Sequence, residues 1–179
     1  MNLKKIKIIS IFGIFALTFG LHFLYQFLPS TFTAMFSPVN ESIWEHQKLL
    51  FTSVILYGII DYLLLRKFKV KYNNFYVALF ISALSIIPAF LIMYLPQYFK
   101  IGQSMFMNIF IMFLAIIVSQ YISYKILSTR NDSYSKNLIS IGLIGICFII
   151  FSYFTYYPIK TKLFFDTEEE KYGINNYNI

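Results

Sequence analysis

Long apolar runs alternate with short polar or basic segments along almost the whole chain. A helix rises about 1.5 Å per residue, so an apolar run near ~20 residues can cross a hydrocarbon core about 30 Å thick. Five such runs are present, and together they leave no room for a separate soluble domain. The pattern therefore predicts an all-α fold, a polytopic membrane bundle of five transmembrane helices that forms a single domain over residues 1–179. The helices are expected at residues 8–28, 41–65, 75–95, 105–127 and 138–157, followed by a tail at 158–179.

Prolines and one short amphipathic stretch punctuate these runs. Pro29 is expected to end the first helix, Pro88 to kink the third and Pro96 to stop it, because proline lacks a backbone N–H and clashes with the preceding turn. In residues 29–39, apolar side chains recur at helical spacing. This spacing predicts a short helix lying at the membrane interface.

The composition agrees with a membrane protein. Of 179 residues, 58% are hydrophobic and 13% are charged, whereas about a quarter are charged in soluble domains. The net charge of +7 could indicate nucleic acid, but the cations flank the apolar runs, so we expect a lipid bilayer and no nucleic acid as partner. Enrichment in Ile, Phe, Lys, Asn and Tyr suggests an AT-rich bacterial genome and hence a bacterial cytoplasmic membrane. The sequence leaves the oligomeric state open.

The positions of the cations predict the orientation. Cytoplasmic loops of membrane proteins collect Lys and Arg. With the N-terminus inside, ten of the fifteen cations lie on the inner flanks and the C-terminus lies outside. The ten are Lys4, Lys5, Lys7, Arg66, Lys67, Lys69, Lys71, Lys125, Arg130 and Lys136.

Residues 37–48 concentrate the chemistry of the chain. They hold two of its eight carboxylates, one of its two histidines and its only tryptophan, directly before the second apolar run. Carboxylate and imidazole together can perform general acid–base catalysis or hold a metal ion that activates water. The candidate catalytic residues are Glu41, Glu45 and His46. The candidate ligand-binding residues are Asn40, His22, Asp166 and Trp44.

Each of these residues also has a structural interpretation. Glu41 and Glu45 lie four apart, so on a helix they would share a face and could hold a cation, or they could complement the helix dipole. Ser42 and Glu45 fit a capping box, in which each side chain bonds the other residue's backbone N–H. Trp44 can anchor the helix at the interface or stack on a ligand.

His22 is expected to face the bundle interior, because an imidazole in an apolar helix needs a partner. It lies about 23 Å from Lys7 along its helix, whereas His46 lies about 30 Å from Arg66 at the same rise per residue. The two imidazoles reach the same depth only if Asp61, rather than Arg66, marks the inner boundary. A divalent metal ion held by His22, Glu45 and His46 is then possible.

Asp61, near the inner end of the second helix, is too far from Glu45 to share its site. Gln120 lies at a suitable depth to donate a hydrogen bond to it, and Arg66 or Lys67 could neutralise it. A proton-relay role is the alternative for an acid at this depth.

The polar motif carries a resemblance to a known family. The matching segments are His22-Phe23-x-Tyr25, Pro38-Val39-Asn40-Glu41-Ser42-Ile43-Trp44-Glu45-His46-x-Lys48-Leu49, Leu163-Phe164-x-Asp166 and Tyr172-Gly173. They resemble a family of small bacterial multi-pass membrane proteins that carries only a domain-of-unknown-function label. The resemblance implies the fold and the membrane location, and it implies no activity.

Two functions fit these observations. One is an enzyme with an outer-face carboxylate–histidine site that acts on a lipid-linked or other membrane-proximal substrate, by metal-assisted or acid–base chemistry. The alternative is a non-enzymatic ligand-binding or small transport protein that uses the same groups. The middle of each apolar run is nearly bare of polar residues, which favours an outer site over a path through the bilayer. A structural or interaction role is a third option.

The predicted orientation can be tested with reporter fusions. Fusions at Lys69 and Lys136 are expected to report a cytoplasmic location, and fusions at Lys100 and Ile179 an extracytoplasmic one. A cytoplasmic reporter at Ile179 would contradict the count of five spans.

Overall fold

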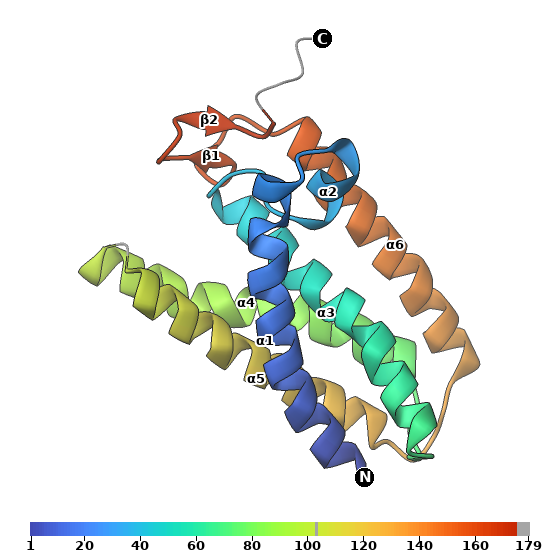
Figure 1. Ribbon diagram of the computed structural model, residues 1–179. Coiled ribbons are helices and arrows are strands. Elements are labelled where there is room, and N and C mark those ends of the chain that lie inside the picture. The colour runs from blue at the N-terminus through green and yellow to red at the C-terminus, as the bar shows by residue number, and fades with distance from the viewer. Residues whose placement is uncertain (103, 175–179) are drawn as a thin grey trace.

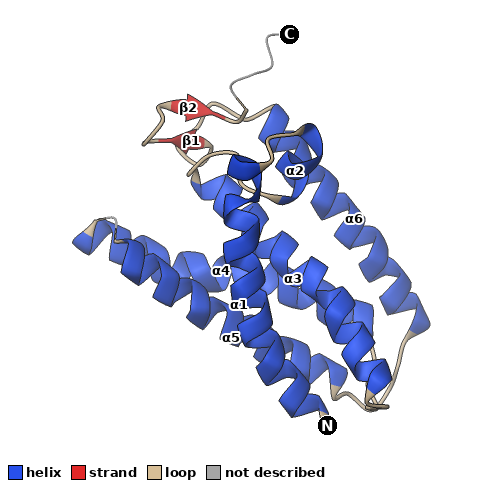
Figure 2. Ribbon diagram, viewed as in Figure 1, coloured by secondary structure: helices blue, strands red, loops and turns tan. Residues whose placement is uncertain are grey.

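The computed structural model describes residues 1–102 and 104–174, so the predicted extracytoplasmic Ile179 lies outside the described residues. The described chain forms six α-helices and one short antiparallel β-hairpin (Figures 1 and 2). The helices are α1 Leu3–Phe27, α2 Thr31–Phe36, α3 Ile43–Lys67, α4 Phe75–Ile101, α5 Met105–Leu127 and α6 Tyr134–Tyr156. The hairpin pairs β1 Phe165–Asp166 with β2 Lys171–Tyr172.

The predicted all-α membrane bundle is confirmed. Five helices, α1, α3, α4, α5 and α6, are long and apolar enough to cross a membrane. The short helix expected within residues 29–39 is α2, and Ser30 and Thr33 form a reciprocal capping box at its start. The hairpin and the N-terminus lie at opposite ends of the bundle (Figure 1). These are called the hairpin end and the N-terminal end below.

Local capping explains where the helices begin and end. At the start of α3, α5 and α6, the side chain of an N-cap serine accepts a hydrogen bond from the backbone N–H of the residue three positions later. This bond satisfies a donor that has no partner within the helix. The predicted stop at Pro96 is wrong, because α4 continues through Pro88 and Pro96 to Ile101. It ends at Gly102, whose φ of +83° favours glycine.

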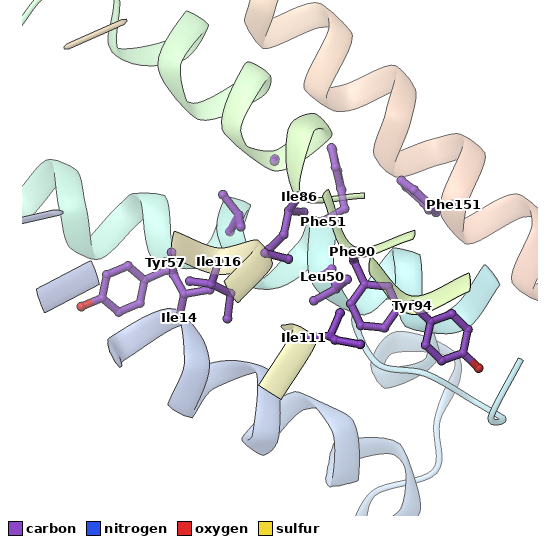
Figure 3. Close-up of a cluster of buried hydrophobic side chains, with 13 residues drawn as sticks. Ile14, Leu50, Phe51, Tyr57, Ile86, Phe90, Tyr94, Ile111, Ile116 and Phe151 are labelled. Carbon is purple, nitrogen blue, oxygen red and sulfur yellow. The ribbon is translucent and has the colours of Figure 1, made fainter. Parts of the chain in front are cut away.

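Four helices close a ring around the core. α1 contacts α3, α3 contacts α4, α4 contacts α5, and α5 returns to α1, while α6 packs outside the ring against α4. α3 is the most buried of the five spans. Side chains from all five spans form one buried apolar cluster (Figure 3). Because lipid tails are as apolar as the core, close packing rather than water exclusion holds such helices together.

A buried ion pair joins α1 to α3 near the N-terminal end. Lys7 Nζ lies 2.5 Å from Asp61 Oδ2, and the Ser10 hydroxyl donates to Asp61 Oδ1 at 2.5 Å. Asp61 is therefore paired with a cation, but neither Gln120 nor Arg66 is its partner. The Gln120 amide donates to Ser119 instead, and Arg66 donates to Tyr62.

The two helices also cross closely at Gly13. A Cβ on Gly13 would lie 2.2 Å from the Tyr57 ring, so any larger residue there would have to displace that ring. Ion pair and glycine together set the register between α1 and α3.

Breaking this ion pair should destabilise the fold. Lys7→Met and Asp61→Asn are each expected to lower the free energy of unfolding by about 3–5 kcal/mol, because each leaves one buried group unpaired. The double variant should lose clearly less than the sum of the two, as residues in direct contact do. Thermal and denaturant unfolding of the purified protein measures this, with Lys5→Met, which removes an exposed cation, as control. Additive losses would contradict the pairing.

Candidate metal centre

The C-terminal tail holds the polar motif in place at the hairpin end. The Asn40 side chain donates to the Gly173 carbonyl at 3.2 Å, and the Glu41 backbone N–H donates to Asp166 Oδ2 at 2.8 Å. The Trp44 backbone N–H donates to the Leu163 carbonyl at 3.0 Å. The hairpin therefore lies over the start of α3 (Figure 1) and fixes the loop that precedes it.

Asp166 positions this loop. Its side chain is fully buried, and besides the Glu41 N–H it accepts the backbone N–H groups of Glu168 and Glu169 at 2.8 and 3.2 Å. Asn40 also bonds locally, since its side-chain oxygen accepts the Ser42 N–H at 3.0 Å. Both were expected to bind ligand, and the structure instead engages both in hydrogen bonds within the protein.

Trp44 lies in an aromatic cluster. Its ring centroid is 4.9 Å from that of Phe151, 5.3 Å from Phe154 and 4.7 Å from Phe164. Phe151 and Phe154 belong to α6 and Phe164 to the tail, so Trp44 ties the start of α3 to both. This packing gives the Trp44 ring a structural role at the start of α3.

Glu45 belongs to a second buried ion pair. Its Oε2 lies 2.6 Å from Lys48 Nζ and accepts the Val39 N–H at 3.2 Å, while its Oε1 accepts the Thr155 hydroxyl at 2.7 Å. Lys48 is fully buried and also donates to the Ala34 carbonyl at 2.7 Å. Only half of the expected capping box forms, because the Glu45 carboxylate bonds Val39 rather than Ser42.

Glu41, not Glu45, joins the two histidines. Its Oε2 lies 3.3 Å from His46 Nε2 and 3.7 Å from His22 Nε2, and the two imidazole centroids are 5.5 Å apart. One ligand atom from each of the three residues lies within 4.8 Å of the others. Glu41 precedes α3, so it does not share a helix face with Glu45 as the four-residue spacing suggested. We call His22, Glu41 and His46 the triad.

The buried pair at the far end explains why the histidines meet. Fifteen residues separate Lys7 from His22 on α1, and fifteen separate His46 from Asp61 on α3. In antiparallel helices of equal rise, a contact between Lys7 and Asp61 brings the two histidines to the same depth, about 23 Å away. The contact between Lys7 and Asp61 thus supplies the helix register that the pairing of the histidines required.

The protein orients one imidazole of the triad. His46 Nδ1 lies 3.0 Å from the Ser42 carbonyl, which can only accept, so this nitrogen carries the proton. Nε2 then presents its lone pair to Glu41 when the ring is neutral. A lone pair facing a carboxylate requires a proton or a cation between them.

Glu41 remains ionised at neutral pH. Its interaction with the His22 imidazole first, and with His46 next, lowers the pKa of the Glu41 carboxyl well below its usual range, although partial burial opposes this. The triad therefore offers an anion and two imidazoles at one point.

The triad lines a cavity of about 550 Å³ between α1, α3, α4 and α5. Gln47, which follows His46, lines this cavity and was not among the residues predicted from the sequence. Gln47 is only 4% exposed, and neither of its amide atoms has a hydrogen-bond partner in the described structure. Asn108 Oδ1 and His22 Nδ1, from the same cavity, are also buried without a partner. The feature of the sequence that could have indicated Gln47 is a glutamine next to a long apolar run.

Fold and site together define a multi-pass membrane protein with a histidine–carboxylate cluster beside a cavity at one end of its bundle. The chain belongs to the Family of unknown function (DUF6512), which matches residues 1–174. No curated protein and no solved structure matches the chain.

The two glutamates of the motif should respond differently to the same substitution. Glu45→Gln is expected to cost about 3–5 kcal/mol of stability, because it leaves the buried Lys48 ammonium without its counter-charge. Glu41→Gln removes a partly exposed carboxylate and should leave the unfolding midpoint within a few degrees of the wild-type value. Thermal unfolding of both variants measures the difference. An equal loss of stability in the two variants would contradict the separate roles of Glu45 and Glu41.

Proposed function

We propose that the protein is a membrane enzyme in which His22, Glu41 and His46 hold a divalent metal ion, zinc by ligand type, that activates water for hydrolysis. The observation that carries this proposal is the convergence of the three side chains at the wall of a cavity. They come from α1, from the loop before α3 and from α3 itself. Two imidazoles and one carboxylate are a ligand set of catalytic zinc sites, in which a fourth position stays open for water.

The spacing of the ligand atoms supports zinc. Ligands held tetrahedrally at about 2.0–2.1 Å from one ion lie roughly 3.3–3.4 Å apart. The distances from Glu41 Oε2 are 3.3 Å to His46 Nε2 and 3.7 Å to His22 Nε2. The Ser42 carbonyl that fixes the His46 tautomer is the kind of outer hydrogen bond that metal-binding histidines make.

The ion would supply a water of lowered pKa as nucleophile. In the hydrolysis, the hydroxyl of one water joins the electrophilic centre of the substrate, and the bond to the leaving group breaks. The remaining proton goes to the leaving group. The cavity beside the triad supports a substrate that lies in or near the membrane. The distribution of cations supports a site on the outer side of the membrane. The residue composition supports a bacterial cytoplasmic membrane.

Metal analysis of the purified protein tests the centre. After growth with zinc and removal of loose metal, wild-type protein is expected to retain about one zinc per chain. His22→Ala, Glu41→Gln and His46→Ala should each lose stoichiometric zinc, because two ligands hold zinc far less tightly than three. Glu170→Gln, which removes an exposed carboxylate of the hairpin, is the control. Triad variants that keep zinc, or wild-type protein that holds none, would refute the centre.

Hydrolysis itself is tested with 4-nitrophenyl dodecanoate, a neutral activated ester whose product absorbs visible light. The zinc-loaded protein in nanodiscs should turn it over, and the Glu41→Gln variant should not. Equal rates of hydrolysis for the wild type and the Glu41→Gln variant would favour the alternative function, a non-enzymatic ligand-binding protein.

A further inference from the structure

We infer that the cavity beside the triad holds the apolar chain of a membrane amphiphile, which enters sideways between α1 and α5 and places its polar end at the triad. This inference names the substrate class of the proposed enzyme, and for the chemistry at the polar end it rests on that proposed function. The hydrolysed bond would then lie where the head group of the amphiphile joins its chain.

The cavity is polar at the hairpin end and apolar one turn deeper. His22 and His46 line it, and so do Phe19 on α1 and Leu50 on α3, which lie three and four residues nearer the N-terminal end of the bundle. Residues at this spacing share a helix face, so each histidine has an apolar side chain about 4.5–6 Å below it. A ligand along this wall meets imidazole first and hydrocarbon next, which is the order of groups in an amphiphile.

The cavity has a closed apolar floor. On α5 the lining residues Met105, Ile109 and Met112 recur at helical spacing, so one face of this helix borders the cavity over about two turns, roughly 10 Å. The next residue, Phe113, contacts Phe15 of α1 at a ring-centroid distance of 5.2 Å and closes the gap between the two helices. One apolar side chain from each of the four helices lines the deeper part of the cavity, and these are called the floor: Phe19, Leu50, Phe90 and Met112.

The cavity is open to lipid between α1 and α5. Its lining includes Phe23 on α1 and Met105 on α5, which are 41% and 75% exposed and belong to spanning helices. α5 diverges from α1 toward the hairpin end (Figure 1). A chain can therefore pass from the bilayer into the cavity without crossing water. The volume of about 550 Å³ is within the range of ligand pockets.

The polar end of the cavity selects the amphiphile. Because lipid tails are as apolar as the floor, moving a chain from the bilayer into the cavity gains little free energy by itself. With the proposed divalent ion in place, its double positive charge outweighs the charge of Glu41, so the triad attracts an oxygen of the head group. Glu168, the other carboxylate among the described lining residues, is exposed, and solvent screens its charge. The head group thus supplies affinity, and the floor sets which bond lies at the ion.

Photo-crosslinking locates the chain on wild-type protein. Zinc-loaded protein in nanodiscs is irradiated with dodecanohydroxamic acid, whose head group binds zinc and whose chain carries a diazirine either beside the head or at its far end. Label that an excess of unlabelled dodecanohydroxamic acid removes counts as specific. The far-end probe is expected to label the floor specifically, and the probe with the diazirine beside the head should label Phe23 or the histidines of the triad. Mass spectrometry of the digested protein reads the labelled residues.

Two results of this experiment would overturn the inference without any variant. One is far-end label on the floor that the competitor does not remove. The other is label spread alike over the floor and over lipid-facing residues such as Ile146, which is exposed on α6.

Met112→Trp tests the assigned floor. The larger indole is expected to lower the specific far-end label on Leu50 and Phe90 at least about ten-fold, the scale on which overpacking opposes an added group. Met93→Trp is the control, because Met93 is also a partly buried methionine but is not among the described residues that line the cavity. It should be labelled as the wild type is. Wild-type labelling in Met112→Trp would refute the floor.

Zinc analysis of the same samples separates the two proposals. Protein that holds zinc but shows no specific label on the floor would refute the substrate class and leave the metal centre standing. Protein that is labelled on the floor but holds no zinc would refute the metal centre and leave the chain site standing.

Discussion

The buried contact between Lys7 and Asp61 is the constraint on which the site depends. Charges in the interior of a membrane bundle are costly unless paired, so the two helices must meet where these residues meet. The Ser10 hydroxyl completes the carboxylate's bonding, and Gly13 lets Tyr57 pass close to α1. Because each helix is rigid, this register is transmitted to the other end. There it brings together two histidines that lie far apart in sequence.

A second buried pair shapes the hairpin end. Lys48 and Glu45 lie on one turn of α3, and both bond Thr155 of α6. Lys48 also donates to the Ala34 carbonyl of α2, and Glu45 accepts the Val39 N–H. The motif thus divides its two carboxylates between different tasks. Glu45 is engaged by contacts within the fold, whereas Glu41, two residues before the start of α3, lines the cavity. The polar richness of the motif therefore reflects both architecture and a candidate site.

The apolar pattern predicts structure best where the bilayer restricts the possible folds. Lipid permits only helices or closed barrels to cross it, so apolar runs near ~20 residues predicted the five spans directly. The choice between Glu41 and Glu45 was not predictable in this way, because it depends on which carboxylate Lys48 reaches and on α3 beginning at Ile43. Lys7 was interpreted as an orientation signal in a basic flank, since nothing in one sequence distinguishes a buried lysine from an exposed one. Gln47 was visible in the sequence, but only the packed structure reveals that its amide lacks a partner.

The triad is held by contacts that are independent of any metal ion. The depth of His22 follows from the register of α1, and His46 is fixed by its helix and by the Ser42 carbonyl. The backbone of Glu41 is fixed by the fully buried Asp166 in the tail. Three separate parts of the chain thus place the three candidate ligand residues in the absence of any ion. A site prepared in this way loses little conformational entropy on binding, and more of the coordination energy remains as affinity. The tail contributes no residue to the triad, but through Asp166 it holds Glu41 in place and is therefore part of the site.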